Sequence, residues 1–91
     1  MIFYRYEKED GGGPYYEKNG RNRITGYISE DDTLDGCFTI VDLKQWFSNR
    51  EKDVTDCIIH CYDGELIRLN RRDKTGIFKK STAIRLYAAQ K

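Results

Sequence analysis

The sequence predicts an α+β fold: a small antiparallel sheet of about four or five strands, with one main helix over about residues 39–49 packed on one face. Three features lead to this prediction. One segment has a helix start signal and an apolar stripe, several segments alternate between apolar and polar residues, and Asp63-Gly64 separates two apolar runs. A chain of 91 residues has room for one core, so we expect a single domain over residues 1–91.

The helix is expected to begin after Thr39, whose hydroxyl can accept a hydrogen bond from the backbone N–H of Asp42. Asp42 lies in the first turn, where the helix dipole stabilises a carboxylate. An apolar stripe follows at spacings of three and four residues: Ile40, Leu43, Trp46 and Phe47. We therefore expect the sheet to pack against this stripe, with Trp46 and Phe47 in the core.

Residues 57–62 and 65–70 are two apolar runs on either side of Asp63-Gly64. An Asp-Gly pair between such runs is a strong signal for a two-residue β-hairpin. The pairs expected in this hairpin are Tyr62–Glu65, His60–Ile67 and Ile58–Leu69. Both faces of the hairpin are largely apolar, so we expect it to lie centrally in the sheet.

Two further segments alternate as strands do, residues 2–7 and residues 82–87. In the second we expect Ile84 and Leu86 to face inward, and Arg85 and Tyr87 to face outward. Residues 77–78 either begin this strand or form a short strand of their own.

Residues 10–36 are expected to form a long loop, either mobile or partner-binding, with one short strand at 24–28. It opens with Gly11-Gly12-Gly13-Pro14, but neither a helix nor a Gly-Lys-Ser/Thr motif follows. This pattern predicts a turn or linker rather than a phosphate-binding loop. Three tyrosines lie in the loop: Tyr15, Tyr16 and Tyr27.

The composition excludes a helical membrane protein, because no run approaches 18 apolar residues. The first residues alternate as a strand and lack the basic and apolar regions of a signal peptide, so we expect a soluble intracellular protein.

Charge is distributed unevenly along the chain. Residues 1–66 contain 8 Lys/Arg and 14 Asp/Glu, whereas residues 67–91 contain 8 Lys/Arg and a single acid, Asp73. Such segregation indicates a surface with an acidic and a basic side, and a charged partner, unless the strands interleave the two halves.

Cys57, His60 and Cys61 are close in sequence, yet a strand would place the two thiols about 13 Å apart, at ~3.3 Å per residue. His60 would point to the opposite face, so these residues cannot share a zinc ion or form a disulfide. With Cys37, we expect three free thiols, no metal and no cofactor. A Cys–His dyad would need Cys37 from a distant segment, and no orienting carboxylate is evident, so we expect no enzymatic activity.

The candidate partner-binding residues are a basic set, an acidic set and two tyrosines. They are Arg68, Arg71, Arg72, Lys74, Lys79, Lys80 and Arg85; Glu30, Asp31 and Asp32; and Tyr15 and Tyr16. Gathered near one sheet edge, the basic side chains can bind phosphates or an acidic protein surface. A merely solvated face is an equally good interpretation of the same residues.

Three motifs occur in a fixed order: Tyr4-Arg5-Tyr6-Glu7, then Gly11-Gly12-Gly13-Pro14-Tyr15, then Gly36-Cys37-Phe38-Thr39 leading to Leu43-Lys44-Gln45-Trp46-Phe47. Together they resemble a group of small phage and prophage proteins. Members of that group open with Tyr-Arg-x-Glu, continue with a Gly-Pro-aromatic loop and a helix reading Leu-x-x-Trp-Phe, and close with strands.

The resemblance covers about half of the chain and ends after the helix, where the hairpin and the basic tail are this chain's own. It implies a virus-encoded protein that acts in the cytoplasm of a bacterial host as an inhibitor of defence, such as an anti-CRISPR. It implies no catalytic residues.

We therefore expect a non-enzymatic inhibitor that binds a host bacterial protein or nucleoprotein complex. In this interpretation the acidic set imitates a phosphate backbone, or the basic set pairs with acidic groups or nucleic acid, while the tyrosines anchor the contact. The alternative is a small nucleic-acid-binding protein that uses the basic C-terminal residues.

Overall fold

The computed structural model describes residues 1–9, 11–16, 25 and 32–89. Within them the prediction of an α+β fold with one main helix is confirmed, but the sheet has six strands rather than four or five. The elements are β1 Ile2–Glu7, β2 Thr33–Cys37, α1 Ile40–Trp46, η1 Glu51–Val54, β3 Ile58–Asp63, β4 Leu66–Asn70, β5 Thr75–Lys79, η2 Lys80–Thr82 and β6 Ile84–Ala89. The region expected to hold a short strand, residues 24–28, lies outside the described residues apart from Thr25.

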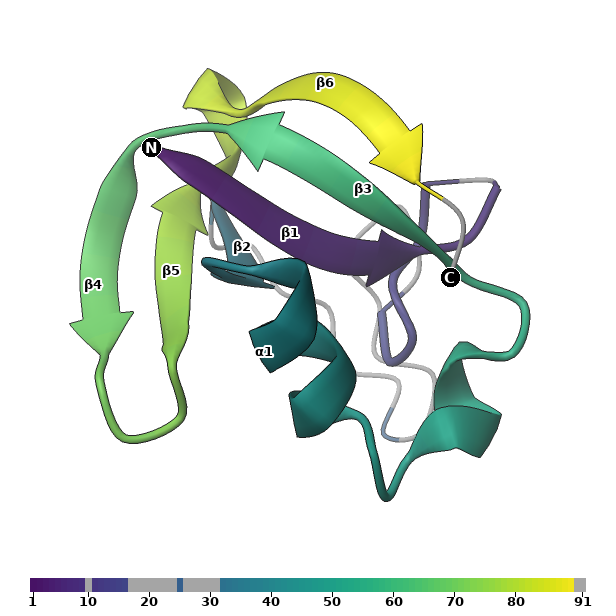
Figure 1. The fold of residues 1–91 in the computed structure, drawn as a ribbon. Coiled ribbons are helices and arrows are strands. Elements are labelled where there is room, and N and C mark those ends of the chain that lie inside the picture. Colours follow the sequence, from purple (N-terminus) through teal and green to yellow (C-terminus); the bar gives the residue numbers. More distant parts are fainter. Residues whose placement is uncertain (10, 17–24, 26–31, 90–91) are drawn as a thin grey trace.

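The strands form one antiparallel sheet in the order β4-β5-β2-β1-β3-β6, with β1 in the interior and β4 and β6 at the two edges (Figure 1). The first strand was expected at residues 2–7 and is found there. Ile77 and Phe78 belong to a strand of their own, β5. The sheet order also places the basic part of the chain (β4, β5 and β6) at both edges and the acidic part (β1, β2 and β3) in the middle.

The predicted Asp63-Gly64 hairpin is wrong: β3 pairs with β1 and β6, and β4 pairs with β5. A two-residue hairpin turn needs a glycine with positive φ, and Gly64 is not among the described residues with positive φ. Instead its N–H donates to the Met1 carbonyl at 3.0 Å, and a Cβ on Gly64 would lie 3.1 Å from the Phe3 ring. Contacts with the first strand therefore hold this glycine in an extended link.

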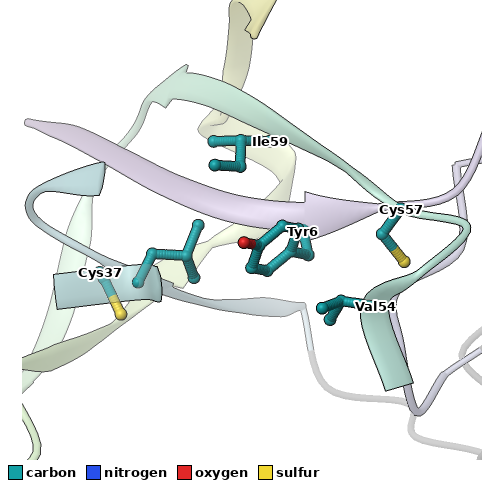
Figure 2. Packing of buried hydrophobic residues seen from close by; sticks show 6 residues of the cluster. Tyr6, Cys37, Val54, Cys57 and Ile59 are labelled. Atoms are coloured by element: carbon teal, nitrogen blue, oxygen red, sulfur yellow. The ribbon is translucent and has the colours of Figure 1, made fainter. Parts of the chain in front are cut away.

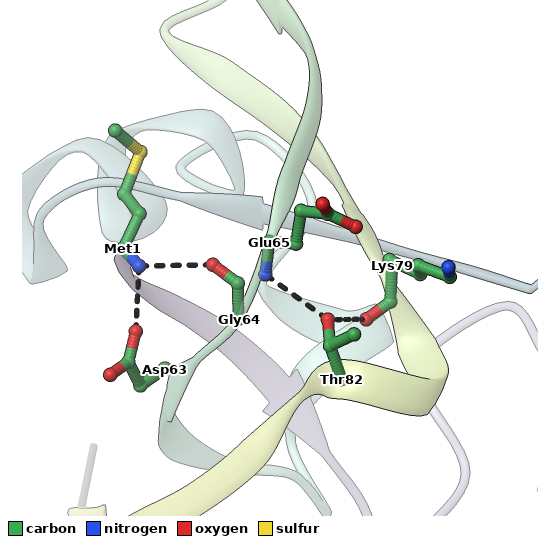
Figure 3. Close-up of polar contacts among 6 residues, drawn as sticks. All are labelled: Met1, Asp63, Gly64, Glu65, Lys79 and Thr82. Carbon is green, nitrogen blue, oxygen red and sulfur yellow. Dashed lines mark hydrogen bonds and ion pairs between the residues drawn. The ribbon is translucent and has the colours of Figure 1, made fainter.

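The link from β3 to β4 joins strands that are four positions apart in the sheet, so the sheet must curl until its edges approach each other. Figure 3 shows the contacts at this corner. The Met1 amino group lies 2.6 Å from Asp63 Oδ1, and the Glu65 N–H donates to Thr82 Oγ1 at 3.2 Å. The Thr82 hydroxyl in turn donates to the Lys79 carbonyl. Through its two hydrogen bonds, Thr82 connects η2 to the start of β4.

The N-terminal cap of the helix is confirmed, because Thr39 Oγ1 accepts from the Asp42 N–H at 3.0 Å. The helix is shorter than predicted and ends at Trp46. Its buried residue is Leu43, which is 3% exposed, whereas Trp46 is 37% exposed. The expectation that Trp46 belongs to the core is therefore wrong: a helix of seven residues covers only part of the sheet, and its last turn lies at the border.

The core between the sheet, α1 and η1 consists of six buried residues: Tyr6, Cys37, Leu43, Val54, Cys57 and Ile59. Figure 2 shows how side chains from β1, β2, β3 and η1 converge there. All three cysteines are buried, and none of them forms a disulfide with another. Among the described residues, no group of His, Cys, Asp or Glu side chains is arranged to hold a metal ion.

On the opposite face of the sheet, Phe3 of β1 and Phe78 of β5 stack with ring centroids 3.8 Å apart, although β2 lies between their strands. The stack is possible because Gly36 of β2, which pairs with Gly76 of β5, has no side chain. A Cβ on Gly36 would lie 2.5 Å from Phe3 Cδ2.

The last strand, β6, is found near its predicted position, but the expected inward orientation of Ile84 and Leu86 is wrong. Ile84 is 66% exposed and Leu86 is 50% exposed. Alternation of apolar and polar residues indicates a strand, but it does not indicate whether other elements cover that strand. β6 lies at an edge of the sheet, where its side chains are exposed.

Candidate binding cleft beside the helix

A cleft of about 300 Å³ opens between α1, β2, the segment 13–16 and the β4–β5 hairpin. We call it the binding cleft. Beside the cleft, β1 and β2 are in register at a single pair, Tyr4 and Cys37. The side chains that give the binding cleft its character are five aromatic and four charged ones: Tyr6, Tyr15, Tyr16, Trp46 and Phe47; Arg5, Asp35, Arg68 and Asp73.

One wall of the binding cleft is an ordered turn rather than a linker. The Gly13 N–H donates to the Tyr16 carbonyl at 2.8 Å, and the Lys8 N–H donates to the Gly12 carbonyl at 2.6 Å. Gly11 has φ of 93°, in the left-handed region that favours glycine. Gly13 is closely packed: a Cβ at this position would lie 3.1 Å from the Arg5 guanidinium.

The turn presents its two tyrosines differently. The Tyr15 hydroxyl donates to Asp53 Oδ2 at 2.8 Å, and its ring stacks on Phe47 at 6.3 Å. Burial and this contact with Asp53 raise the pKa of Tyr15, so the hydroxyl stays protonated at neutral pH. Tyr16 is exposed. Tyr15 is thus a fixed part of the wall, and Tyr16 is available to a partner.

Phe47 organises the aromatic surface of the binding cleft. Its ring meets Tyr6 edge-on at 5.2 Å and lies 4.9 Å from the Trp46 ring. The Arg50 guanidinium covers one face of Trp46, 4.3 Å from the ring centroid. This cation–π contact holds the exposed indole in place at the rim.

Charges of both signs surround these rings. Arg68 of β4 and Asp35 of β2 are exposed and make no ion pair among the described residues. Asp73 accepts a hydrogen bond from the Asn70 amide at 2.9 Å, which orders the β4–β5 turn. The rim can therefore orient a partner by charge, while the interior is aromatic.

The thiol at the floor of the binding cleft, Cys37, is suited to packing rather than to nucleophilic attack. Burial, with smaller contributions from Asp42 and Asp35, raises its pKa to about 11. A thiol with this pKa is almost entirely protonated at neutral pH, and the thiolate is the nucleophilic form.

A second polar group of residues, outside the binding cleft except for Arg5, lies across β1 and β3: Arg5, Glu7, His60 and Tyr62. The buried Glu7 carboxylate accepts from the Tyr62 hydroxyl, which lies 2.7 Å from both oxygens. Arg5 Nε is 3.0 Å from Glu7 Oε2, an ion pair whose angle does not make a hydrogen bond. This group explains how a carboxylate is tolerated in the middle of the sheet.

His60 is the chain's only histidine, and it is 4% exposed. Its Nδ1 is 3.5 Å from Glu7 Oε1, and neither ring nitrogen has a hydrogen-bond partner in the described part of the chain. Burial lowers the pKa of His60; Glu7 opposes this effect, and Arg85 and Arg5 add to it. The imidazole is therefore neutral at neutral pH.

The candidate residues named from the sequence are spread over the molecule rather than gathered. Tyr15 and Tyr16 line the binding cleft, as does Arg68. The other basic residues lie in three places: Arg71, Arg72 and Lys74 in the β4–β5 turn; Lys79 and Lys80 where β5 meets η2; and Arg85 on β6. These three places belong to different elements of the sheet.

The acidic set is placed only in part. Asp32 accepts from the backbone N–H and the hydroxyl of Ser81, at 2.9 and 2.6 Å, so it fixes η2. Glu30 and Asp31 lie outside the described residues.

Sequence reasoning missed six of the nine side chains named above: Arg5, Tyr6, Asp35, Trp46, Phe47 and Asp73. The helical stripe did single out Trp46 and Phe47, but it assigned them to the core. No local signal marks Arg5 or Asp35, because they come from β1 and β2, two segments distant in sequence that only the sheet brings together.

Comparisons of the chain with family models, with curated proteins and with solved structures found no match. None of the helices in the described part of the chain is both long enough and apolar enough to span a membrane.

Proposed function

We propose that this protein is a non-enzymatic inhibitor that binds a partner protein by holding one of the partner's side chains in the binding cleft. The observation that carries this proposal is the combination of five aromatic side chains with a rim of both charges around a cleft of about 300 Å³. Aromatic pockets that exclude water are where binding energy concentrates in protein interfaces.

The geometry favours a large apolar or aromatic side chain as the occupant. Tyr6 and Phe47 form the inner surface, and Tyr16 and Trp46 are the exposed aromatic residues at its opening. Tyr15 and Trp46 are already held, by Asp53 and by Arg50, so little side-chain entropy is lost when a partner binds. The charges of Arg68 and Asp35, which form no ion pair within the described part of the chain, would set the partner's orientation.

Binding is favoured over catalysis by the state of the groups in the binding cleft. The Cys37 thiol is protonated at neutral pH, and the buried His60 does not line this cleft. A cysteine nucleophile acts as the thiolate, which is scarce at this pKa, and no histidine is among the described residues that line the cleft.

The nature of the partner follows from the resemblance of the sequence motifs to small phage and prophage proteins. On that basis the partner is a bacterial protein or nucleoprotein complex in the host cytoplasm, and the activity is inhibition of defence, as in an anti-CRISPR. Affinity purification from bacterial lysate, followed by mass spectrometry, would identify the partner.

A second candidate function, nucleic-acid binding, is favoured by one observation. The β4–β5 turn exposes three cations within four residues, Arg71, Arg72 and Lys74. Phosphate contacts made there would give salt-dependent binding, with a slope near −0.9 per contact for duplex DNA. Charge reversal of Arg71 and Arg72 to Glu separates this function from binding in the cleft.

The test compares two variants at the mouth of the cleft, Tyr16→Ala and Trp46→Ala, with Val41→Ala as the matched control. Val41 is on the same helix, 72% exposed and not in the cleft. If the proposal holds, at least one cleft variant weakens partner binding by about 30-fold or more, as expected for an interface hot spot. Val41→Ala should bind like the parent. Unchanged binding by both cleft variants, with their circular dichroism unchanged, would contradict the proposal.

A further inference from the structure

The floor of the binding cleft is a sheet face shared by β2, β5 and β4. Ile77 of β5 lies opposite Asp35 of β2 on one side and opposite Arg68 of β4 on the other. Residues directly opposite each other in antiparallel strands point to the same face. These three side chains, which all line the cleft, therefore form one row across its floor. We call it the charged row.

The charged row has opposite charges at its two ends. Neighbouring strands are about 4.8 Å apart, so the backbones at Asp35 and Arg68 are separated by about 10 Å. Both side chains are exposed, and neither forms an ion pair within the described part of the chain. Burial raises the pKa of Cys37, and Asp42 and Asp35 add to this effect, as expected for a carboxylate on the same face of β2 as the thiol. The cleft thus presents a carboxylate and a guanidinium at a defined spacing, with Ile77 between them.

This spacing discriminates between the extended conformations that a bound segment can adopt. In a β-strand, residues two apart share a face at about 6.6 Å, and residues four apart share it at about 13 Å. Neither distance matches about 10 Å. In a polyproline II helix every third residue lies on the same edge, and the rise of about 3.1 Å per residue separates residues i and i+3 by about 9.3 Å. The polyproline II conformation therefore fits the charged row.

The aromatic lining of the cleft favours the same conformation. Aromatic-lined grooves are a general means of binding polyproline II segments, whose backbone is already ordered before it binds. Tyr16 and Trp46 are the exposed aromatic residues of the cleft, and they come from the segment 13–16 and from α1. An α-helix would reach a similar spacing only over two turns, between residues seven apart. The aromatic side chains and the charged row together favour polyproline II.

On the basis of the function proposed for the binding cleft, we propose that the cleft holds a proline-rich segment of the partner in the polyproline II conformation. A basic residue of the segment lies over Asp35, and an acidic residue three positions away lies over Arg68. The two residues between them point to the sides, and one of these is the large apolar side chain that contacts the aromatic residues. The basic residue comes first in one chain direction and the acidic residue in the other.

The probe is a seven-residue peptide with blocked ends, Pro-Arg-Pro-Leu-Glu-Pro-Pro, in which the two charges are three residues apart. Its matched control, Pro-Pro-Arg-Leu-Glu-Pro-Pro, has the same composition with the charges two residues apart. The fluorescence of Trp46, the single tryptophan, reports binding, and the backbone amide NMR shift of Ile77 locates it. We expect the probe to bind with a Kd below about 1 mM. It should bind about two- to fivefold more tightly than the control, the range expected for an exposed ion pair.

Two variants test the charged row directly. Arg68→Glu places a carboxylate at both ends, so this variant should bind the probe more weakly than the parent does. It should instead prefer the doubly basic peptide Pro-Arg-Pro-Leu-Arg-Pro-Pro. Arg85→Glu, on the other edge strand, is the matched control and should keep the preference of the parent. Both arginines are exposed, so we expect both variants to fold, which circular dichroism checks.

The proposal is overturned if the probe does not bind below about 1 mM or is not preferred over its control, or if Arg68→Glu keeps the preference of the parent. Tighter binding of an alanine-based helical peptide with Arg and Glu seven residues apart would also overturn it, because a helix would then occupy the cleft. Failure of the proposed function gives a different result: partner binding that Tyr16→Ala and Trp46→Ala leave unchanged. Partner binding that depends on these two residues, with no preference among the peptides, would reject only the polyproline II segment.

Discussion

Leu43 and Trp46 are three residues apart on one stripe of α1, but they have different roles. Leu43 packs inside the core, whereas Trp46 lies at the rim of the binding cleft under Arg50. We predict that Leu43→Ala lowers the free energy of unfolding by about 2–5 kcal/mol, the usual cost of a truncated core leucine. Trp46→Ala should cost less than about 2 kcal/mol, below the range for a buried tryptophan. Urea denaturation monitored by circular dichroism measures both.

The order of the two effects is the informative result. If Trp46→Ala is as destabilising as Leu43→Ala, the indole belongs to the core and is not available to a partner.

His60 predicts how stability depends on pH. Its pKa is lowered in the folded protein, chiefly by burial, so the unfolded chain binds a proton more readily than the folded one. Stability should therefore be complete above the unfolded pKa of about 6.5 and should decrease as pH falls below it toward the lower folded value. Urea midpoints between pH 7.5 and 5.5 would show this decrease.

The control for this prediction is His60→Gln, which cannot titrate and should show a smaller change over the same range. An unchanged slope in this variant would assign the pH dependence to other groups. Because the chain has one histidine, the NMR signals of its imidazole also give the folded pKa directly.

At the scale of elements, Gly36 of β2 decides how three neighbouring strands pack. Its missing side chain lets Phe3 of β1 stack on Phe78 of β5. We predict that Gly36→Ala is destabilising by about 1–3 kcal/mol, the cost of overpacking, because the new Cβ would displace the Phe3 ring. Thr33→Ala, at the exposed end of the same strand, should change stability by less than about 0.5 kcal/mol. Equal midpoints for the two variants in thermal unfolding would contradict this account.

At the scale of the whole molecule, the sheet is assembled mainly from segments that are distant in sequence. Ile2 of β1 lies opposite Asp63 of β3, and Thr33 of β2 lies opposite Lys79 of β5; of the six strands that the structure describes, only β4 and β5 form a local hairpin. Sheets dominated by such pairings fold in milliseconds to seconds. We predict refolding in that range, followed in a stopped-flow instrument by the fluorescence of Trp46, the single tryptophan. Refolding within microseconds would contradict it.

Local signals in the sequence were sufficient to predict the type and position of several helices and strands. Thr39 and Asp42 cap α1 as their spacing predicts, and the alternation of residues 2–7 locates β1. Two of the aromatic residues of the binding cleft, Tyr15 and Tyr16, were also singled out from the sequence. These predictions succeed because helix caps and strand alternation depend on residues only a few positions apart.

Only the tertiary structure decided which strands pair, which stripe residues are buried and where the binding cleft opens. Asp63-Gly64 has the sequence of a hairpin turn, yet Met1 and Phe3, distant in sequence, hold it in an extended link. Trp46 continues the apolar stripe of α1, with the spacing typical of buried residues. It nevertheless lies in the last turn of the helix, at the border of the sheet, and is exposed. Pairing and burial depend on contacts between distant segments, so a pattern within one segment determines that a strand or helix forms, but not what lies against it.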